Sequence, residues 1–204
     1  MPELPEVETI VRDLRTRIPG QVIRKVGVRR PDILTDITPA QFQRRLRGRR
    51  ITGVERRAKN IVIALDDGGT LVVHLGMTGQ LVIVAEKAAE DYRHVAVRFD
   101  LEEGRVLLYD DVRRFGRIAH FAPGRWDLRA QELGVEPLSD DFTPALLHQL
   151  TRASRLPIRN WLLDPYRVAG VGNIYANEAL FRAGVRPTRR ANFVTRAESA
   201  RLRD

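Results

Sequence analysis

The sequence predicts an α+β fold in which an N-terminal helix and an antiparallel β-sandwich precede a helical domain. From Gln21 to Phe121, short runs rich in Val, Ile and Leu alternate with Gly, Asp and Pro, and most neighbouring runs have no helix between them. After about Pro123 the apolar residues recur at helical spacing instead. A chain of 204 residues has room for two small domains. We expect them at residues 1–130 and 131–204.

The first element is expected to be a helix that stops at Pro19-Gly20. Its core-facing residues, at helical spacing, are Val7, Ile10, Val11, Leu14 and Ile18. Glu3, Glu6 and Glu8 are expected in the first turn, where negative charge is favourable against the helix dipole. The dipole alone therefore explains these acidic residues without a catalytic role.

Eight strands are expected next, with one helix among them. The predicted strands are residues 21–29, 49–56, 60–66, 70–75, 80–84, 94–100, 105–109 and 116–121. Asp66-Asp67-Gly68-Gly69 predicts a tight hairpin. Thr38-Pro39 is an N-cap followed by Pro, which predicts a helix to about Leu46. The strand pattern by itself fits a sandwich or a barrel.

Helices are expected in the last third of the chain, after a linker at residues 122–140. Thr143-Pro144 begins one that reaches about Leu150, and the next two are expected at residues 158–163 and 173–183. Thr195 and Glu198 form a capping-box pattern for a fourth helix. This helix has only about two turns, and so short a helix is rarely stable without others packed against it. We therefore expect the helical domain to lack part of its full set of helices.

The composition favours a polyanionic partner. The net charge is +9 and the isoelectric point is about 10.8, which suits nucleic acid or an acidic membrane surface. The positive charge is scattered through the strands, which disfavours the membrane. Of the 35 basic residues 32 are Arg, which fits bidentate phosphate contacts and equally fits the codon usage of a GC-rich genome.

The chain has no cysteine, which excludes a disulfide framework, thiol chemistry and Cys-ligated zinc within these residues. No apolar run reaches about 18 residues, and the N-terminus is acidic where a signal peptide requires positive charge. We therefore expect a cytoplasmic protein.

The opening residues, Met1-Pro2-Glu3-Leu4-Pro5-Glu6, could supply an amine nucleophile. Methionine is normally removed before a small second residue, which would expose the nitrogen of Pro2 as a secondary amine. An α-amino group titrates near ~8, so a neutral fraction exists at pH 7. Its adduct with an aldehyde-like carbon is an iminium, which stays positively charged and acts as an electron sink. Glu3 and Glu6 could supply acid–base steps beside it.

Four further motifs place reactive or phosphate-binding residue types together. They are Arg56-Arg57-Ala58-Lys59 at the start of a strand, His74-Leu75-Gly76-Met77-Thr78-Gly79 as a turn, Asp111-Val112-Arg113-Arg114-Phe115-Gly116 as a loop, and Gly170-Val171-Gly172-Asn173 before a helix. A helix N-terminus binds anions because its backbone N–H groups point outward. Each motif also has an ordinary structural explanation as a solvated charge, a structural histidine, a core methionine or a helix cap.

Together these motifs resemble the formamidopyrimidine-DNA glycosylase family, the bacterial enzymes that excise oxidised purines. The resemblance runs from Met1 to about Pro187, and its motifs, in the family's order, are MPELPEVET, RRAKN, HLGMTG, DVRRFG, GVEPLSDDF and AGVGNIYANEALF. Leu4 and Val7 are the residue types that the branch of the family acting on oxidised purines has at these positions, so the chain resembles that branch. The resemblance implies a monomeric DNA glycosylase and AP lyase of base excision repair, located at the bacterial nucleoid, that acts on 8-oxoguanine and formamidopyrimidine in double-stranded DNA.

The resemblance also implies a role for individual residues. Pro2 would attack C1′ of the damaged nucleotide, Glu3 would be the general acid–base and Glu6 would stabilise the covalent intermediate. Lys59, as the family's strand lysine, would contact phosphate and the region of the lesion.

Other residues would bind the DNA around the lesion. Met77, Arg113 and Phe115 would fill the gap left by the extruded base, since an apolar wedge and a planar cation replace part of the lost stacking. Asn173, in the family's helix-two-turn-helix motif, would bind backbone phosphate together with His74.

Two departures from the family pattern affect DNA binding. Arg159-Asn160-Trp161 stands where the family has Lys-Pro before the Trp, and Arg159 would contact phosphate with a different geometry. The family's four-cysteine zinc finger is absent from these 204 residues, so we expect no metal or cofactor and a weaker grip on DNA. A non-catalytic or lyase-only DNA-binding protein is the alternative.

Overall fold

The computed structural model describes residues 2–204, and they form two compact units. The first unit extends to Leu128 and the second runs from Arg129 to Asp204. The boundary lies two residues before the one expected between residues 130 and 131. The expected removal of Met1 concerns a residue outside the described part.

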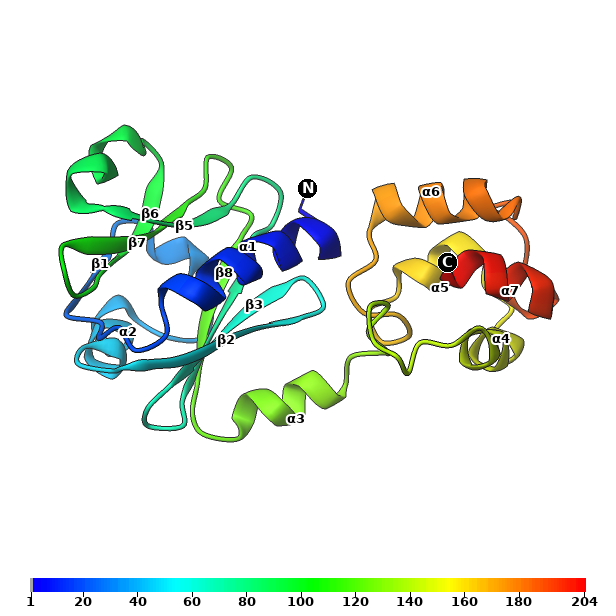
Figure 1. Cartoon of the computed structure of the whole chain (residues 1–204), viewed down its shortest axis with the longest axis horizontal. Coiled ribbons are helices and arrows are strands. Elements are labelled where there is room, and N and C mark those ends of the chain that lie inside the picture. The colour runs from blue at the N-terminus through cyan, green and yellow to red at the C-terminus, as the bar shows by residue number, and fades with distance from the viewer. Residues whose placement is uncertain (1) are drawn as a thin grey trace. The chain divides into compact units, whose positions relative to one another are not determined.

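The first unit contains two four-stranded antiparallel sheets (Figure 1). One has the strand order β1-β6-β7-β5 and the other β2-β3-β4-β8. The bounds are β1 Lys25–Val28, β2 Ile51–Arg57, β3 Asn60–Leu65, β4 Thr70–His74, β5 Gln80–Ala85, β6 Val95–Asp100, β7 Arg105–Asp110 and β8 Arg117–Phe121. The predicted antiparallel sandwich is confirmed, and a closed barrel is wrong because each sheet keeps two edge strands.

Helix α1 (Leu4–Arg17) supplies one side of the core of the first unit. Val7, Val11 and Leu14 recur at helical spacing and are buried against both sheets. Figure 1 shows α1 (blue) lying over β2 and β3. Helix α2 (Pro39–Leu46) adds Phe42, whose ring meets Phe99 edge-on at 6.2 Å between centroids. The remaining short helices of this part are η1 (Pro31–Ile33) and η2 (Glu86–Asp91).

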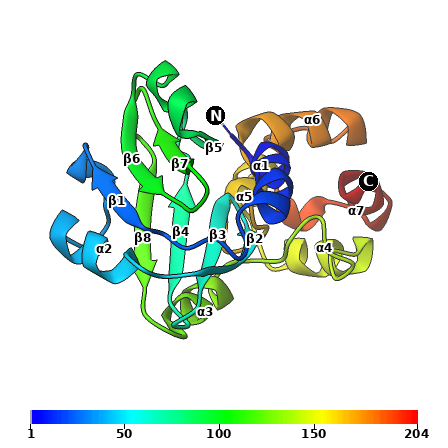
Figure 2. The same cartoon turned by 60° about the vertical axis from the view of Figure 1, so that its left-hand side comes forward.

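The second unit packs its helices around a core of its own (Figure 2). The helices are α4 (Pro144–Arg152), α5 (Ile158–Leu163), α6 (Asn173–Ala183), η3 (Ala191–Phe193) and α7 (Arg196–Arg203). Trp161 lies fully buried at the centre. The capping box of Thr195 and Glu198 begins α7 as predicted. The two-turn α7 is held because it packs on α4 and α6 and buries Leu202.

One helix was missed within the expected linker of residues 122–140. Helix α3 (Arg125–Gln131) forms there, and the ring of its Trp126 lies 5.4 Å from that of Phe121. The helix is too short for its sequence to show a clear helical periodicity. The contact with β8 stabilises it instead. Within residues 2–204 no helix is both long and apolar enough to span a bilayer.

We predict that Leu14→Ala lowers the free energy of unfolding by about 2–5 kcal/mol, because Leu14 is fully buried and its loss leaves a cavity. Leu128→Ala is the matched control in the same unit, since Leu128 is 58% exposed, and it should change stability by less than about 0.5 kcal/mol. Urea unfolding followed by circular dichroism measures both. Equal losses in the two variants would contradict this view of the core.

Candidate functional site

Three of the predicted site residues lie at the start of α1 or directly before it. Glu3 is the N-cap residue and is buried, and its backbone N–H donates to Glu6 Oε2 at 2.9 Å in a reciprocal capping box. Pro2, directly before this cap, is half-buried. The capping box therefore fixes the chain direction at Pro2 and places its ring at the start of a turn that carries two carboxyl groups.

Glu8 was wrongly expected in the first turn. The acidic residue of that turn is Glu6, and Glu8 lies further along α1, where it forms ion pairs with Arg56 at 2.7 Å and Arg12 at 3.0 Å. Burial opposes the charge of Glu8, but the hydrogen bonds from Arg56 and Arg12 hold its pKa below the usual value. Glu8 thus fastens α1 to β2.

Lys59 lies in the two-residue turn between β2 and β3, not in a strand as expected. Its neighbour Ala58 adopts a left-handed conformation with φ of 53°, as this tight hairpin requires. Burial lowers the pKa of Lys59 from its ordinary value, while the negative charge of Glu3 opposes that shift. The turn therefore brings the predicted cation into the electrostatic field of the helix cap.

His74, the last residue of β4, is paired with Asn60 and so lies beside the Lys59 turn. Burial lowers the pKa of His74, and the positive charges of Lys59 and Arg117 lower it further. The ring is consequently neutral near pH 7. The backbone N–H of Gly76 donates to Nδ1 at 3.2 Å, so the proton of the neutral ring is on Nε2, which is a donor.

The buried carboxylate of Asp111 joins two loops that carry the predicted wedge residues. One lies between β4 and β5 and carries Met77; the other lies between β7 and β8 and carries Arg113 and Phe115. It accepts hydrogen bonds from the Thr78 hydroxyl at 2.6 Å and from the backbone N–H of Gly116 at 2.9 Å and of Arg113 at 3.3 Å. The Tyr109 hydroxyl donates a further bond at 3.1 Å. Burial alone would raise the pKa of Asp111, but these hydrogen bonds hold it below the usual value.

The two loops approach too closely for a side chain at Gly76. A Cβ atom there would lie 2.5 Å from the backbone nitrogen of Gly116, and the φ of Gly76 is +62°. Gly76, the first glycine of the HLGMTG motif, is thus needed for the contact between the two loops, independently of any ligand.

Met77, Arg113 and Phe115 stand on the outside of these joined loops. Met77 is 39% exposed and Phe115 is 52% exposed, although both are large apolar residues. The guanidinium carbon of Arg113 lies 4.7 Å from the centroid of the Phe115 ring. The loops therefore present apolar surface and a planar cation to solvent, which suits stacking against bases.

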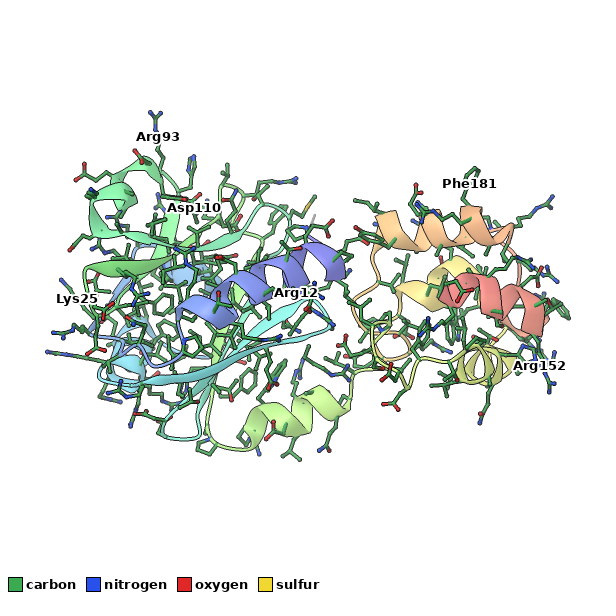
Figure 3. The ribbon with its side chains drawn as sticks, viewed as in Figure 1. Arg12, Lys25, Arg93, Asp110, Arg152 and Phe181 are labelled. Carbon is green, nitrogen blue, oxygen red and sulfur yellow. The ribbon has the colours of Figure 1, made fainter. Side chains whose placement is uncertain are left out.

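A cationic pocket of about 340 Å³ lies beside the second loop and was not predicted. Its lining includes Arg29, Arg30, Arg93, His94 and Arg114. These residues come from three separate segments of the sequence, so no local motif identifies them; only Arg114 belongs to the DVRRFG motif. Figure 3 shows Arg93 projecting away from the sandwich. The cations are suited to bind phosphate groups.

In the second unit the structure brings Arg159 and Asn173 together. Asn173 is the first residue of α6, as predicted, and follows the N-cap residue Gly172. Arg159 on α5 donates from Nη2 to Asn173 Oδ1 at 2.9 Å. The two predicted phosphate contacts therefore form one hydrogen-bonded cluster.

The chain does not fit the zinc finger that the resemblance implies for longer proteins. It has no cysteine, and residues 2–204 hold no group of three or more His, Cys, Asp or Glu side chains that could bind a metal ion.

Two family models match the chain. The formamidopyrimidine-DNA glycosylase N-terminal domain matches residues 1–118, and the H2TH domain of the same family matches residues 133–204. A formamidopyrimidine-DNA glycosylase of Chloroflexus aggregans is 47% identical over 92% of this chain and 68% of its own length. One from Xanthomonas euvesicatoria is 44% identical over 100% of this chain and 74% of its own.

Solved structures agree with these matches. The MutM (Fpg) protein of Thermus thermophilus superposes with a TM-score of 0.83 and 41% identity, over 99% of this chain and 72% of that one. The Lactococcus lactis Fpg in complex with DNA containing an abasic site gives 0.90 and 31%, over 100% and 74%.

We predict that Asp111→Asn lowers the free energy of unfolding at pH 7 by about 2 kcal/mol, because an amide nitrogen would face groups that donate. The pKa of Asp111 is lower in the folded than in the unfolded protein. Its contribution is therefore complete above the unfolded value near ~4 and is lost as the pH falls through the folded value.

The difference between wild type and variant should therefore shrink in urea titrations below about pH 4. Asp91→Asn, at an exposed position, is the control and should match wild type at both pH values. A stability difference that stays constant with pH would refute the role given to the ionised carboxylate.

Proposed function

The chain belongs to the formamidopyrimidine-DNA glycosylase family, and from that premise we propose that the amine of Pro2 is its nucleophile. The family makes it a DNA glycosylase and AP lyase of base excision repair that acts on damaged double-stranded DNA. We further propose that its preferred substrates are oxidised purines and that it works at the bacterial nucleoid.

In the proposed reaction the nitrogen of Pro2 attacks C1′ of the damaged nucleotide and the bond from C1′ to the base breaks. The base leaves with the bonding electron pair and with the proton that the amine loses. Glu3 protonates the sugar oxygen as the ring opens, which leaves an iminium between Pro2 and C1′. The iminium withdraws electrons, so C2′ loses a proton and the 3′ phosphate leaves; elimination of the 5′ phosphate follows. Water then hydrolyses the iminium and returns the amine.

The observation that carries this proposal is the capped start of α1, where Pro2 directly precedes the reciprocal capping box of Glu3 and Glu6. Pro2 is half-buried, and with Met1 removed its amine would precede this cap directly, so that it could react with a sugar carbon and exchange protons with the carboxyl groups without a large movement of the chain. The Glu6 carboxylate, held at the helix cap, would stabilise the positive iminium.

We assign Lys59 and His74 to the phosphates next to the lesion. The ammonium group of Lys59 and the Nε2 donor of His74 are neighbours on the β2–β3–β4 meander, close to the cap. A neutral His74 costs less to bury against Lys59 than a charged ring would. The cationic pocket around Arg93 would take a further phosphate, as would Arg159 and Asn173 in the second unit.

Met77, Arg113 and Phe115 would replace the extruded base in the stack. Removing a base from the duplex costs a few kcal/mol, and the exposed loops offer apolar surface and a cation to offset that cost. Because Asp111 holds both loops, this surface is already formed before DNA binds.

We predict that Pro2→Gln abolishes the covalent complex that borohydride traps with an abasic duplex. A large second residue retains Met1, so the nitrogen becomes an amide and trapping should fall at least about 100-fold. DNA affinity, measured by fluorescence anisotropy, should change less than about 3-fold. Pro19→Ala, just beyond the other end of α1, is the control and should trap like wild type.

Wild-type protein that binds the duplex but never forms the trapped complex would instead support the non-catalytic alternative. Trapping that is equally efficient in Pro2→Gln would place the nucleophile elsewhere. Mass analysis of the N-terminus shows in each preparation whether Met1 has been removed.

We predict that Phe115→Ala slows excision of 8-oxoguanine by about 10-fold or more, because loss of one stacked ring removes about 1–3 kcal/mol. Lyase cleavage of a preformed abasic site should slow less, since no base has to be extruded. Single-turnover rates on the two duplexes give the comparison. Equal slowing on both substrates would argue against a role in base extrusion.

A further inference from the structure

The guanidinium of Arg159 joins two amides on α6. Its Nε donates to Asn177 Oδ1 at 2.9 Å and its Nη2 to Asn173 Oδ1 at 2.9 Å. Asn173 and Asn177 are four residues apart, so they lie on one face of the helix. One arginine fork thus spans a full turn of α6, starting at the turn that carries the proposed phosphate contact.

The chemistry of the three groups fixes their orientation. Arginine has five N–H donors and no acceptor, so both amides must present their oxygen to it. The amide nitrogens of Asn173 and Asn177 therefore face away, as donors. Two of the five Arg159 N–H groups are used, and the other three have no hydrogen-bond partner within the described residues.

The cluster consequently presents unused N–H donors and one positive charge. No carboxylate pairs with Arg159 in the part of the chain that the structure describes. A phosphodiester has only acceptors and a negative charge, so it complements this surface. Lysine could not hold the same arrangement, because its ammonium is a point charge without the planar fork.

We propose that Asn177 is a positioning residue for DNA binding: it holds the guanidinium of Arg159 in the orientation that aligns the Asn173 amide toward a backbone phosphate. This inference rests on the proposed function, which assigns phosphate binding to Arg159 and Asn173. A long side chain fixed before binding loses less conformational entropy when the phosphate arrives. Asn177 therefore acts through Arg159, without touching the reacting sugar.

A double-mutant cycle tests this indirect role. Affinity for a fluorescent duplex containing a tetrahydrofuran abasic analogue is measured by anisotropy for wild type, Asn177→Ala, Arg159→Lys and the double variant. In the wild-type background Asn177→Ala should weaken binding about 5-fold, the loss expected when one exposed hydrogen bond no longer holds the guanidinium in place. In the Arg159→Lys background it should weaken binding less than about 2-fold, since the fork is already lost.

Phe181→Ala is the matched control. Phe181 lies four residues beyond Asn177, is 85% exposed and points away from the other helices (Figure 3). Its replacement leaves the charge unchanged and should alter affinity less than about 2-fold. Alanine is a better helix former than asparagine, so Asn177→Ala should fold, which thermal unfolding verifies.

The same 5-fold loss in both backgrounds would overturn the proposal, because Asn177 would then contact the phosphate directly. No loss in the wild-type background would overturn it as well. Borohydride trapping by the wild-type protein at saturating DNA is the separate readout of the proposed function, because it reports on Pro2. Absence of trapping in wild type would instead contradict the proposed function, so the two failures are distinguishable.

Discussion

The ionised carboxylate of Asp111 is the constraint on which the wedge surface depends. It lies at the end of β7, fully buried, and its hydrogen bonds fix Thr78 in one loop and Arg113 and Gly116 in the other. Exposed loops with bulky apolar tips are normally mobile, because few contacts offset their conformational entropy. Here one buried charge replaces a local core, and Gly76 allows the two loops to touch. The side chains that face solvent are thereby supported from beneath.

The capping box of Glu3 and Glu6 likewise fixes a proposed functional segment, at the start of the chain. A capping box is a common device for beginning a helix, yet here its two carboxyl groups are also the proposed general acid, Glu3, and the proposed stabiliser of the iminium, Glu6. The field of Glu3 reaches Lys59, and Lys59 in turn affects the ionisation of His74. In the proposed function the same side chains have a structural and a chemical role, so a motif with an ordinary folding explanation can also belong to the proposed active site.

Local signals in the sequence predicted most of the fold. The caps at Thr38, Thr143 and Thr195 begin helices where expected, and all eight predicted strands form, because their turn and capping residues act on near neighbours in the chain. Helix α3 was missed because the packing of Trp126 supports it. The hydrogen bonds of Asp111, the contact of Asn177 with Arg159 and the cationic pocket were missed too, since each depends on residues that meet only after folding. The sequence motifs predicted Met77, Arg113 and Phe115 as wedge residues, but they did not predict the hydrogen bonds of Asp111 that hold their loops.

The capping box also limits how this protein can be engineered. Pro2 directly precedes the cap at Glu3, and each residue inserted between them would move the chain start by up to about 3.8 Å. In the proposed mechanism the nitrogen of Pro2 acts as a free amine, and any affinity tag, fusion partner or acetyl group attached ahead of that ring would make it a planar amide. Purification tags and fluorophores should therefore be attached at exposed positions distant from this end.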